Sequence, residues 1–177
     1  IDEVSAAPRH FEDDETAFKR AQSLFADHPS MKARTLRSVI DEGLDRYAAV
    51  FVPVGQAPVV DLMQDPDVGT ILRHFHEHQK PTALLCHGPI ALAAAMPAAH
   101  EFRAALIASD KARAAELAKG WPYAGCRMTI FSATEEPHVI EDGEPITGQN
   151  PRSDHPIATK LIAALERAGQ EADRQEV

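Results

Sequence analysis

The stretch PTALLCHGPIALAAA, residues 81–95, decides the fold. Residues 81–85 are apolar and short enough to form a buried strand, and an Ala-rich helical segment begins a few residues later. Between them stands Cys-His-Gly-Pro: Gly88 lets the chain turn without a Cβ clash, and Pro89 suits a first helical turn. We therefore predict a sharp strand-to-helix turn that holds Cys86 above the sheet in a strained backbone conformation.

Strands and helices are predicted to alternate along the rest of the chain, which favours a parallel sheet covered on both faces. The expected fold class is a three-layer, doubly wound α/β fold with a mostly parallel sheet. The predicted elements are an amphipathic helix capped by Asp13 or Asp14, a strand in 47–55 buried on both faces, a helix in 65–80, a helix in 98–119, a strand in 126–132, a hairpin in 137–148 and a helix from Ser153 or Asp154.

The composition narrows the classes of partner. The 177 residues carry 18 Lys and Arg against 27 Asp and Glu, a net charge of −9 that repels nucleic acids and anionic membranes. No apolar run reaches membrane-spanning length, and no secretory signal is visible at the start. With only two cysteines, the chain fits a reducing compartment, and we expect a cytoplasmic protein.

Cys86 is the candidate nucleophile. In a doubly wound sheet the crevice lies beyond the carboxyl ends of the strands, where this turn would place the thiol. The dipoles at the start of the following helix would favour the thiolate, and His87 is the adjacent candidate base. The alternative is a buried structural cysteine, since cysteine is among the most buried residue types. Cys126, which has no neighbouring base, is interpreted as a core or strand-edge residue.

Three segments carry a resemblance to a known family. FVPVGQAPVVDL (51–62), ALLCHGPIALAAA (83–95) and ITGQNPRSDHPIA (146–158) resemble the landmarks of the DJ-1/PfpI superfamily, in particular its Hsp31-like branch. The resemblance covers essentially the whole chain. It implies the flavodoxin-like fold of the class I glutamine amidotransferases and a homodimer.

The resemblance also implies a set of site residues. Cys86 would be the nucleophile, His87 its partner and Glu136 the acidic third member, with Glu135 as the fallback. An oxyanion hole would use the backbone N–H groups of His87 and Gly55. Gln56 and Gly88 would belong to the same oxyanion and substrate-binding turns. The resemblance implies no metal or cofactor.

The chain departs from the family pattern in three places. Hsp31-like members usually carry Gly-Gly-His-Gly where this chain has Val54-Gly55-Gln56-Ala57, which makes the pocket bulkier and less basic. The usual first strand, helix and second strand, whose helix carries a Glu that contacts the cysteine, have no counterpart. Residues 136–137 also stand where the family has further chain. We therefore expect residues 1–177 to form one domain that lacks its first strand-helix-strand and a segment near 136–137.

The expected function is a cysteine-dependent, glutathione-independent glyoxalase that converts methylglyoxal to lactate, or a related deglycase; its substrate is a small carbonyl compound. The alternative from another class is a stress-associated chaperone or redox sensor that uses Cys86 without turnover. A glutamine amidotransferase-like hydrolase or a peptidase is a further alternative. The His-Pro-Glu of true glutamine amidotransferases is matched here only by His155-Pro156, because Ile157 replaces the acid.

A histidine-rich segment, RHFHEHQK (73–80), raises the question of a metal. His74 and His78 stand at i and i+4 on a predicted helix, a spacing that can bind a transition metal. His76 would point away from both, and no third ligand is evident in the sequence. The simpler interpretation is a polar helix end, where a histidine is electrostatically favoured.

Overall fold

A computed structural model describes residues 11, 14–29, 32–53, 55–132 and 137–175. The chain divides into two units, residues 1–38 and 39–177. The α-helices are α1 (Glu15–Asp27), α2 (Leu36–Glu42), α3 (Ala57–Val60), α4 (Pro66–Glu77), α5 (Ala99–Ile107), α6 (Lys111–Leu117) and α7 (Asp154–Gln175). The 3₁₀ helices are η3 (Leu44–Arg46), η4 (Leu62–Gln64), η5 (Gly88–Ala95) and η6 (Pro151–Ser153), and the strands are β1 (Val50–Val52), β2 (Thr82–Leu85), β3 (Val139–Glu141) and β4 (Pro145–Gly148).

The first unit contains α1, an amphipathic helix. The side chain of Asp14 accepts hydrogen bonds from the backbone N–H groups of Thr16 and Ala17, which confirms one of the two predicted caps. No described residue of α1 is buried. The apolar residues of this helix therefore do not contribute to the core of the described fold.

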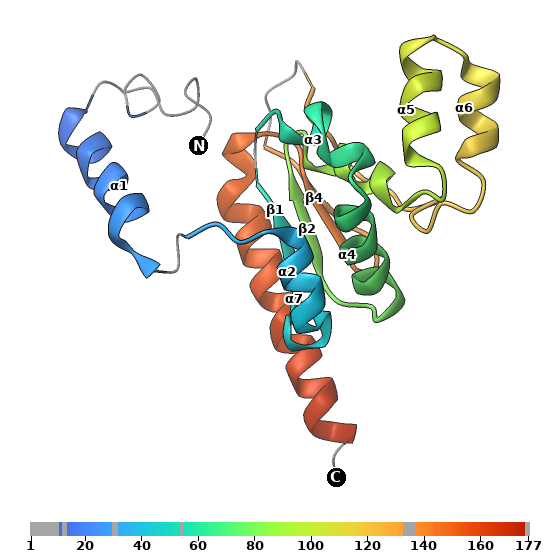
Figure 1. Ribbon diagram of the computed structural model, residues 1–177. Coiled ribbons are helices and arrows are strands. Elements are labelled where there is room, and N and C mark those ends of the chain that lie inside the picture. Colours follow the sequence, from blue (N-terminus) through green and yellow to red (C-terminus); the bar gives the residue numbers. More distant parts are fainter. Residues whose placement is uncertain (1–10, 12–13, 30–31, 54, 133–136, 176–177) are drawn as a thin grey trace. The chain divides into compact units, whose positions relative to one another are not determined.

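The second unit is built on one sheet. Within the described residues its strands lie in the order β1-β2-β4-β3 (Figure 1). β2 is parallel to both β1 and β4, and β3 is antiparallel to β4. β3 and β4 form the predicted hairpin, whose turn contains Gly143 at φ +75°. All residues of β2 are buried, so the strand before Cys86 is the centre of the sheet.

Helices cover both faces of this sheet (Figure 1). On one face Leu84 packs with α4 and η5 in a cluster that includes Leu72 and Leu92. On the other face, Ala83 and Leu85 pack with α7. The alternation of β2 side chains between two apolar layers is what a central strand requires. The predicted α/β, flavodoxin-like fold class is confirmed.

Four local predictions need correction. The strand expected in 47–55 is only Val50–Val52, and Phe51 is 48% exposed because β1 is an edge strand among the described residues. Residues 126–132 form no strand, because β2 and β4, the strands beside them, already have partners on both sides. The helix expected in 98–119 is interrupted at Ser109, with φ +56°, and Asp110 caps α6 separately. The Ala-rich helix after the turn is a 3₁₀ helix.

The helices expected in 65–80 and after residue 153 are present as α4 and α7. Asp65 caps α4 as predicted, by accepting hydrogen bonds from the N–H groups of Asp67 and Val68. α7 begins at Asp154, while the hydroxyl of Ser153 is bonded to the backbone of His138 instead. No helix in the described part of the chain is long and apolar enough to span a membrane.

Candidate functional site

Cys86 occupies the turn between β2 and η5, at the carboxyl edge of the central strand. Its φ is +64°, a left-handed conformation that is uncommon for a residue with a side chain. Its backbone N–H donates to the carbonyl of Gly148 (2.8 Å), and its own carbonyl accepts from the N–H of Phe131 (2.9 Å). The backbone on both sides therefore holds the turn in place, and the predicted strain at Cys86 is confirmed.

Gly88 allows η5 to start directly against β1. A Cβ at this position would lie 3.0 Å from the carbonyl oxygen of Val52 and 3.1 Å from Cβ of Leu84. These contacts are tighter than ordinary van der Waals distances, so the turn depends on the absence of a side chain at residue 88. The role of Gly88 in the described structure is thus close packing.

The imidazole of His87 lies beside the thiol. Sγ of Cys86 is 3.5 Å from Nδ1 of His87, within reach of a weak hydrogen bond that involves sulfur. The His87 ring also stacks on the ring of Phe131, with centroids 4.8 Å apart. The stacking limits the rotation of the imidazole and keeps Nδ1 next to Cys86.

The electrostatics of the thiol differ from the sequence expectation. The Cys86 residue is only 6% exposed. Burial raises the pKa of its thiol, and a backbone hydrogen bond from His87 opposes this effect without cancelling it. The backbone N–H of His87 at the helix start favours the thiolate, as expected, but burial outweighs this contribution. At neutral pH Cys86 rests as a thiol, and a base must remove its proton before it can attack.

Two of the residues predicted for the substrate-binding turn are described. Gly55 adopts φ +140°, and no described atom lies within 4 Å of the position that its Cβ would take; Gln56 is exposed. Val52 pairs with Leu84, so the turn after β1 and the turn after β2 leave the sheet at the same edge. The topology thus brings Gly55 and His87 to one edge of the sheet.

The predicted acidic residue cannot be placed. Glu136 and its fallback Glu135 lie outside the described residues, as does Val54. The same holds for the suspected break between residues 136 and 137. The assignment of Glu136 as the third member of the site stays a prediction.

The structure adds a polar network that the sequence did not suggest. The side-chain amide of Gln149 donates to the hydroxyl of Ser132 (2.8 Å), and its oxygen accepts from the hydroxyl of Thr129 (3.3 Å). The N–H of Thr129 donates to the hydroxyl of Thr147 (2.9 Å). These bonds fix residues 129–132, and with them Phe131, over the Cys86 turn. The only signal in the sequence is the polar pair Gln149-Asn150 directly after a buried strand.

Two other predictions concern residues away from Cys86. Ile157 is 2% exposed and packs in the core with Leu85 and Ile146. The position of the acid in the His-Pro-Glu pattern is therefore a core position here. Cys126 is half-buried and packs against the α4 side of the core, which agrees with its interpretation as a packing residue.

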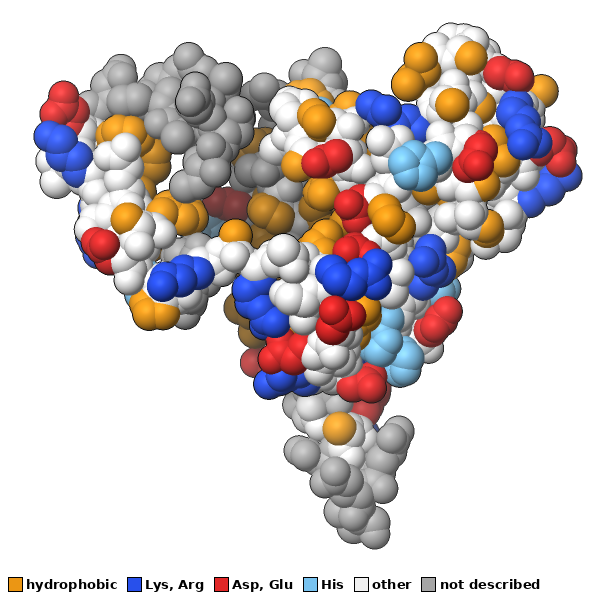
Figure 2. Space-filling model, viewed as in Figure 1, with side chains coloured by type: hydrophobic (Ala, Val, Ile, Leu, Met, Phe, Trp, Pro, Cys, Tyr) orange, Lys and Arg blue, Asp and Glu red, His pale blue; other side chains and the backbone are white. Residues whose placement is uncertain are grey.

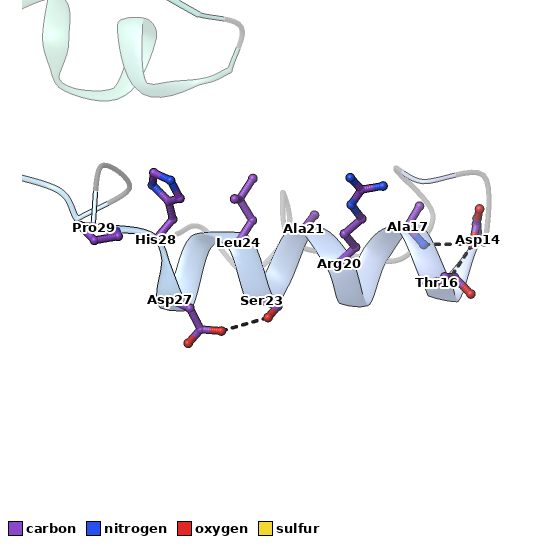
Figure 3. Close-up of a pocket in the computed structure, with 10 residues that line it drawn as sticks. All are labelled: Asp14, Thr16, Ala17, Arg20, Ala21, Ser23, Leu24, Asp27, His28 and Pro29. Atoms are coloured by element: carbon purple, nitrogen blue, oxygen red, sulfur yellow. Dashed lines mark hydrogen bonds between the residues drawn. The ribbon is translucent and has the colours of Figure 1, made fainter.

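Two hollows elsewhere in the described part of the chain lack the chemistry of a catalytic site. The larger one is lined by residues 14–29 of the first unit, and its labelled hydrogen bonds are the Asp14 cap and the Ser23–Asp27 bond (Figure 3). The smaller one, of about 240 Å³, lies between Phe51, Ala83 and α7 and has an apolar lining apart from Asp154. Neither hollow contains a predicted site residue.

Comparison with known proteins agrees with the fold. The model of the DJ-1/PfpI family matches residues 26–164. The chain is 28% identical over 129 residues to "Glutamine amidotransferase-like class 1 domain-containing protein 1" of Bos taurus and 27% identical to the Homo sapiens protein of the same name. In both cases the match covers 66% of this chain and 59% of the relative, so the chain spans less than two thirds of the length of these relatives.

Solved structures share the fold at low sequence identity. The X-ray structure of Rapid Encystment Protein 24 kDa from Francisella tularensis is 20% identical, with a TM-score of 0.56 over 81% of this chain and 70% of that chain. A second crystal structure is 21% identical, with a TM-score of 0.54 over 72% of this chain and 63% of that chain. These likenesses show the fold alone.

Proposed function

This chain belongs to the DJ-1/PfpI family, and we propose that it is the core of a cysteine-dependent enzyme that converts methylglyoxal to lactate without glutathione. One observation carries the proposal: a strained Cys86 at the carboxyl edge of the central strand, with an imidazole nitrogen 3.5 Å from its sulfur. A backbone forced into an unfavourable conformation around a reactive side chain is typical of functional sites. The proposal concerns the activity of the whole protein.

The chemistry starts from a neutral thiol. As Sγ of Cys86 attacks the aldehyde carbon, Nδ1 of His87 takes the thiol proton, so that no thiolate accumulates in the buried site. The aldehyde oxygen becomes the hydroxyl of a hemithioacetal. His87 then moves the proton from this carbon to the neighbouring ketone carbon through an enediol, which leaves a lactoyl thioester on sulfur. Water hydrolyses the thioester and releases lactate and the free thiol, so the overall reaction is redox-neutral.

Backbone N–H groups would stabilise the oxygen on which negative charge develops. His87 and Gly55 are the proposed donors, since the turns that carry them leave the same edge of the sheet. Gln56, exposed after Gly55, would contact the substrate, and Glu136 would orient His87. The related deglycase reaction, hydrolysis of a carbonyl adduct on an amine or thiol, would use the same groups.

A second candidate function is redox sensing or chaperone action without turnover. The burial of Cys86, which is 6% exposed, favours it, because burial restricts the access of a substrate to the sulfur. The raised pKa of the thiol acts against it, since oxidation also proceeds through the thiolate.

Lactate formation from methylglyoxal decides between the two. Full-length protein should produce lactate without added glutathione, and Cys86→Ser should abolish this activity because a hydroxyl is a poor nucleophile at neutral pH. His87→Ala should lower the rate by roughly a hundredfold or more, the scale of losing a positioned acid–base group. Cys126→Ser is the matched control and should keep the wild-type rate. No lactate from the wild type, or full activity of Cys86→Ser, would favour the sensor.

A further inference from the structure

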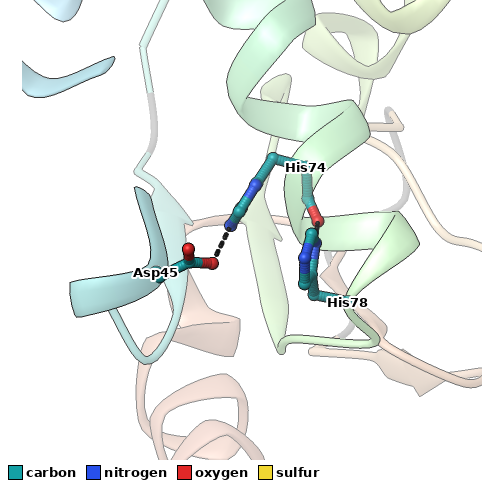
Figure 4. A group of neighbouring side chains, drawn as sticks. All are labelled: Asp45, His74 and His78. Atoms are coloured by element: carbon teal, nitrogen blue, oxygen red, sulfur yellow. Dashed lines mark hydrogen bonds and ion pairs between the residues drawn. The ribbon is translucent and has the colours of Figure 1, made fainter. Parts of the chain in front are cut away.

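Three side chains of types that can bind a metal ion meet at the amino edge of the sheet, the edge opposite Cys86. Asp45 lies in η3, just before β1, and His74 and His78 lie at the end of α4, just before β2 (Figure 4). One ligand atom from each residue can be chosen so that all three lie within 4.8 Å of one another. The sequence showed the two histidines, and the fold supplies the third group from 29 residues earlier in the chain.

Contacts among the neighbouring residues hold η3 against the end of α4. The ammonium of Lys80 donates to the backbone carbonyls of Asp45 (2.9 Å), Tyr47 (3.1 Å) and Leu44 (3.4 Å). Gln79, at φ +52°, turns the chain from α4 back toward β2. The backbone of Asp45 is therefore fixed relative to the two histidines before any ligand binds, which lowers the entropic cost of closing a site.

The hydrogen bonds of the two rings leave nitrogens available. Nδ1 of His78 lies 2.8 Å from the carbonyl oxygen of His74, so this nitrogen carries the proton and Nε2 keeps a lone pair. A histidine ligand usually donates its other N–H in this way, because that bond fixes the tautomer and the ring orientation. The two rings are stacked, with centroids 4.1 Å apart and an angle of 26° between their planes.

The Nε2 atom of His74 is a second, independent observation that points to a bound ligand. This atom is buried and has no hydrogen-bond partner among the described residues, although Oδ1 of Asp45 lies 3.3 Å away. A buried polar atom without a hydrogen bond is rare and costs free energy.

We propose that Asp45, His74 and His78 bind one divalent transition-metal ion, with zinc as the physiological choice and water in the remaining position. Two imidazoles and a carboxylate are a donor set that zinc accepts, at bond lengths of about 2.0–2.2 Å. Tetrahedral bonds of this length place the ligand atoms about 3.3 Å apart. The nitrogen of His74 and the oxygen of Asp45 already stand at 3.3 Å, and all three ligand atoms lie within 4.8 Å of one another, a gap that the exposed ring of His78 has room to close.

The location of these groups allows exchange with solvent. His78 and Asp45 are exposed, and histidine side chains are visible at the lower end of α4, beside acidic ones (Figure 2). The ion would join the turn before β1 to the end of α4. This role does not depend on Cys86, so the site can be tested apart from the proposed enzyme activity.

Direct titration tests the site. Full-length protein without an affinity tag, stripped with a chelator, should bind one Zn²⁺ per chain with a micromolar or tighter Kd by calorimetry. Co²⁺ in its place should give the visible absorption of a four-coordinate site. Because the folded state alone presents the three groups together, Zn²⁺ at a hundredfold excess over its Kd should raise the melting temperature by roughly 5–10 °C.

Matched variants make the result specific. His78→Gln, His74→Gln and Asp45→Asn should each weaken Zn²⁺ binding at least tenfold, whereas His100→Gln, at an exposed histidine of α5, should leave the Kd unchanged. His78→Gln is the decisive variant, since the exposed side chain can be replaced without disturbing the fold, which circular dichroism would verify. Absence of saturable one-to-one binding up to millimolar Zn²⁺ would overturn the proposal, as would equal binding by His78→Gln and the wild type.

Discussion

Cys86 combines a strained backbone with a buried side chain, and these two properties act on different steps of its chemistry. The strain, at φ +64°, fixes where the sulfur lies relative to His87. Burial raises the pKa of the thiol and keeps it protonated. A site built in this way relies on proton transfer at the moment of attack, so the 3.5 Å contact with Nδ1 of His87 matters more than a resting thiolate would.

The raised pKa gives a testable pH dependence. In a Cys126→Ser variant, the rate of Cys86 alkylation by iodoacetamide should reach its half-maximum at a higher pH in the folded protein than in the urea-unfolded chain. Below the ordinary thiol pKa both states are protonated, so Cys86 leaves the free energy of unfolding unchanged there. Above that value the unfolded chain loses its proton first, so the free energy of unfolding falls as pH rises toward the raised pKa. An equal or lower midpoint in the folded protein would contradict this prediction.

Contacts between residues from distant parts of the chain could not be predicted from the sequence. Asp45 beside His74, and Phe131 stacked on His87, are contacts across 29 and 44 residues that no local spacing encodes. The same applies to His76, which pairs with the buried carboxylate of Glu144 on the sheet side of α4. The strained turn at Cys86 was predictable, because a short apolar strand is followed after only two residues by Gly-Pro, which starts the next helix.

At the scale of elements, the packing of α4 on η5 depends on a missing side chain. A Cβ at Gly69, inside α4, would lie 2.2 Å from the carbonyl oxygen of Ala94 in η5. The Ala residues of η5 are small enough to let the two helices approach this closely. The helix tolerates the low helix propensity of Gly69 because the close contact needs it.

Alanine substitutions at two helical glycines should therefore have opposite effects. Gly69→Ala should lower the free energy of unfolding by roughly 2 kcal/mol or more, since the clash with backbone outweighs the gain in helix propensity. Gly169→Ala in α7 should raise it by about 0.5–1 kcal/mol, because no described atom lies within 4 Å of the new Cβ. Urea unfolding of both variants measures the difference. A Gly69→Ala protein as stable as Gly169→Ala would show that α4 and η5 are less closely packed.

Helices and strands were predicted well where the local sequence determines them. They were predicted poorly where pairing with another strand determines them. Asp14 and Asp65 cap their helices as expected, since a cap needs only its own first turn. The hairpin around Gly143 follows from its turn residues in the same way. Residues 126–132 have the composition of a strand, but the strands beside them, β2 and β4, already have partners on both sides. The N–H groups of Arg127 and Thr129 bond instead to the side chains of Asp142 and Thr147. Sheet order cannot be read from composition.

At the scale of the whole molecule, β2 connects the two candidate sites. The thiol of Cys86 lies at its carboxyl end and the proposed metal site at the edge where it begins. β2 has paired strands on both sides and a covered layer on both faces. Such a strand transmits little motion, so the two sites are expected to act independently, and Zn²⁺ should leave the alkylation rate of Cys86 unchanged.

Hydrogen exchange should therefore be slowest in β2 and fast in α1. The amides of Thr82–Leu85 are enclosed by β1, β4 and two apolar layers, so they can exchange only when the second unit opens globally. The described residues of α1 are all unburied, and its amides need only local fraying. Within α7 the same reasoning predicts protection around Ile157, which is 2% exposed, and faster exchange near its exposed C-terminal end. Mass spectrometry of peptides from the exchanged protein measures all three. Exchange of β2 peptides at the rate of α1 peptides would show that the second unit is not held together by its central strand.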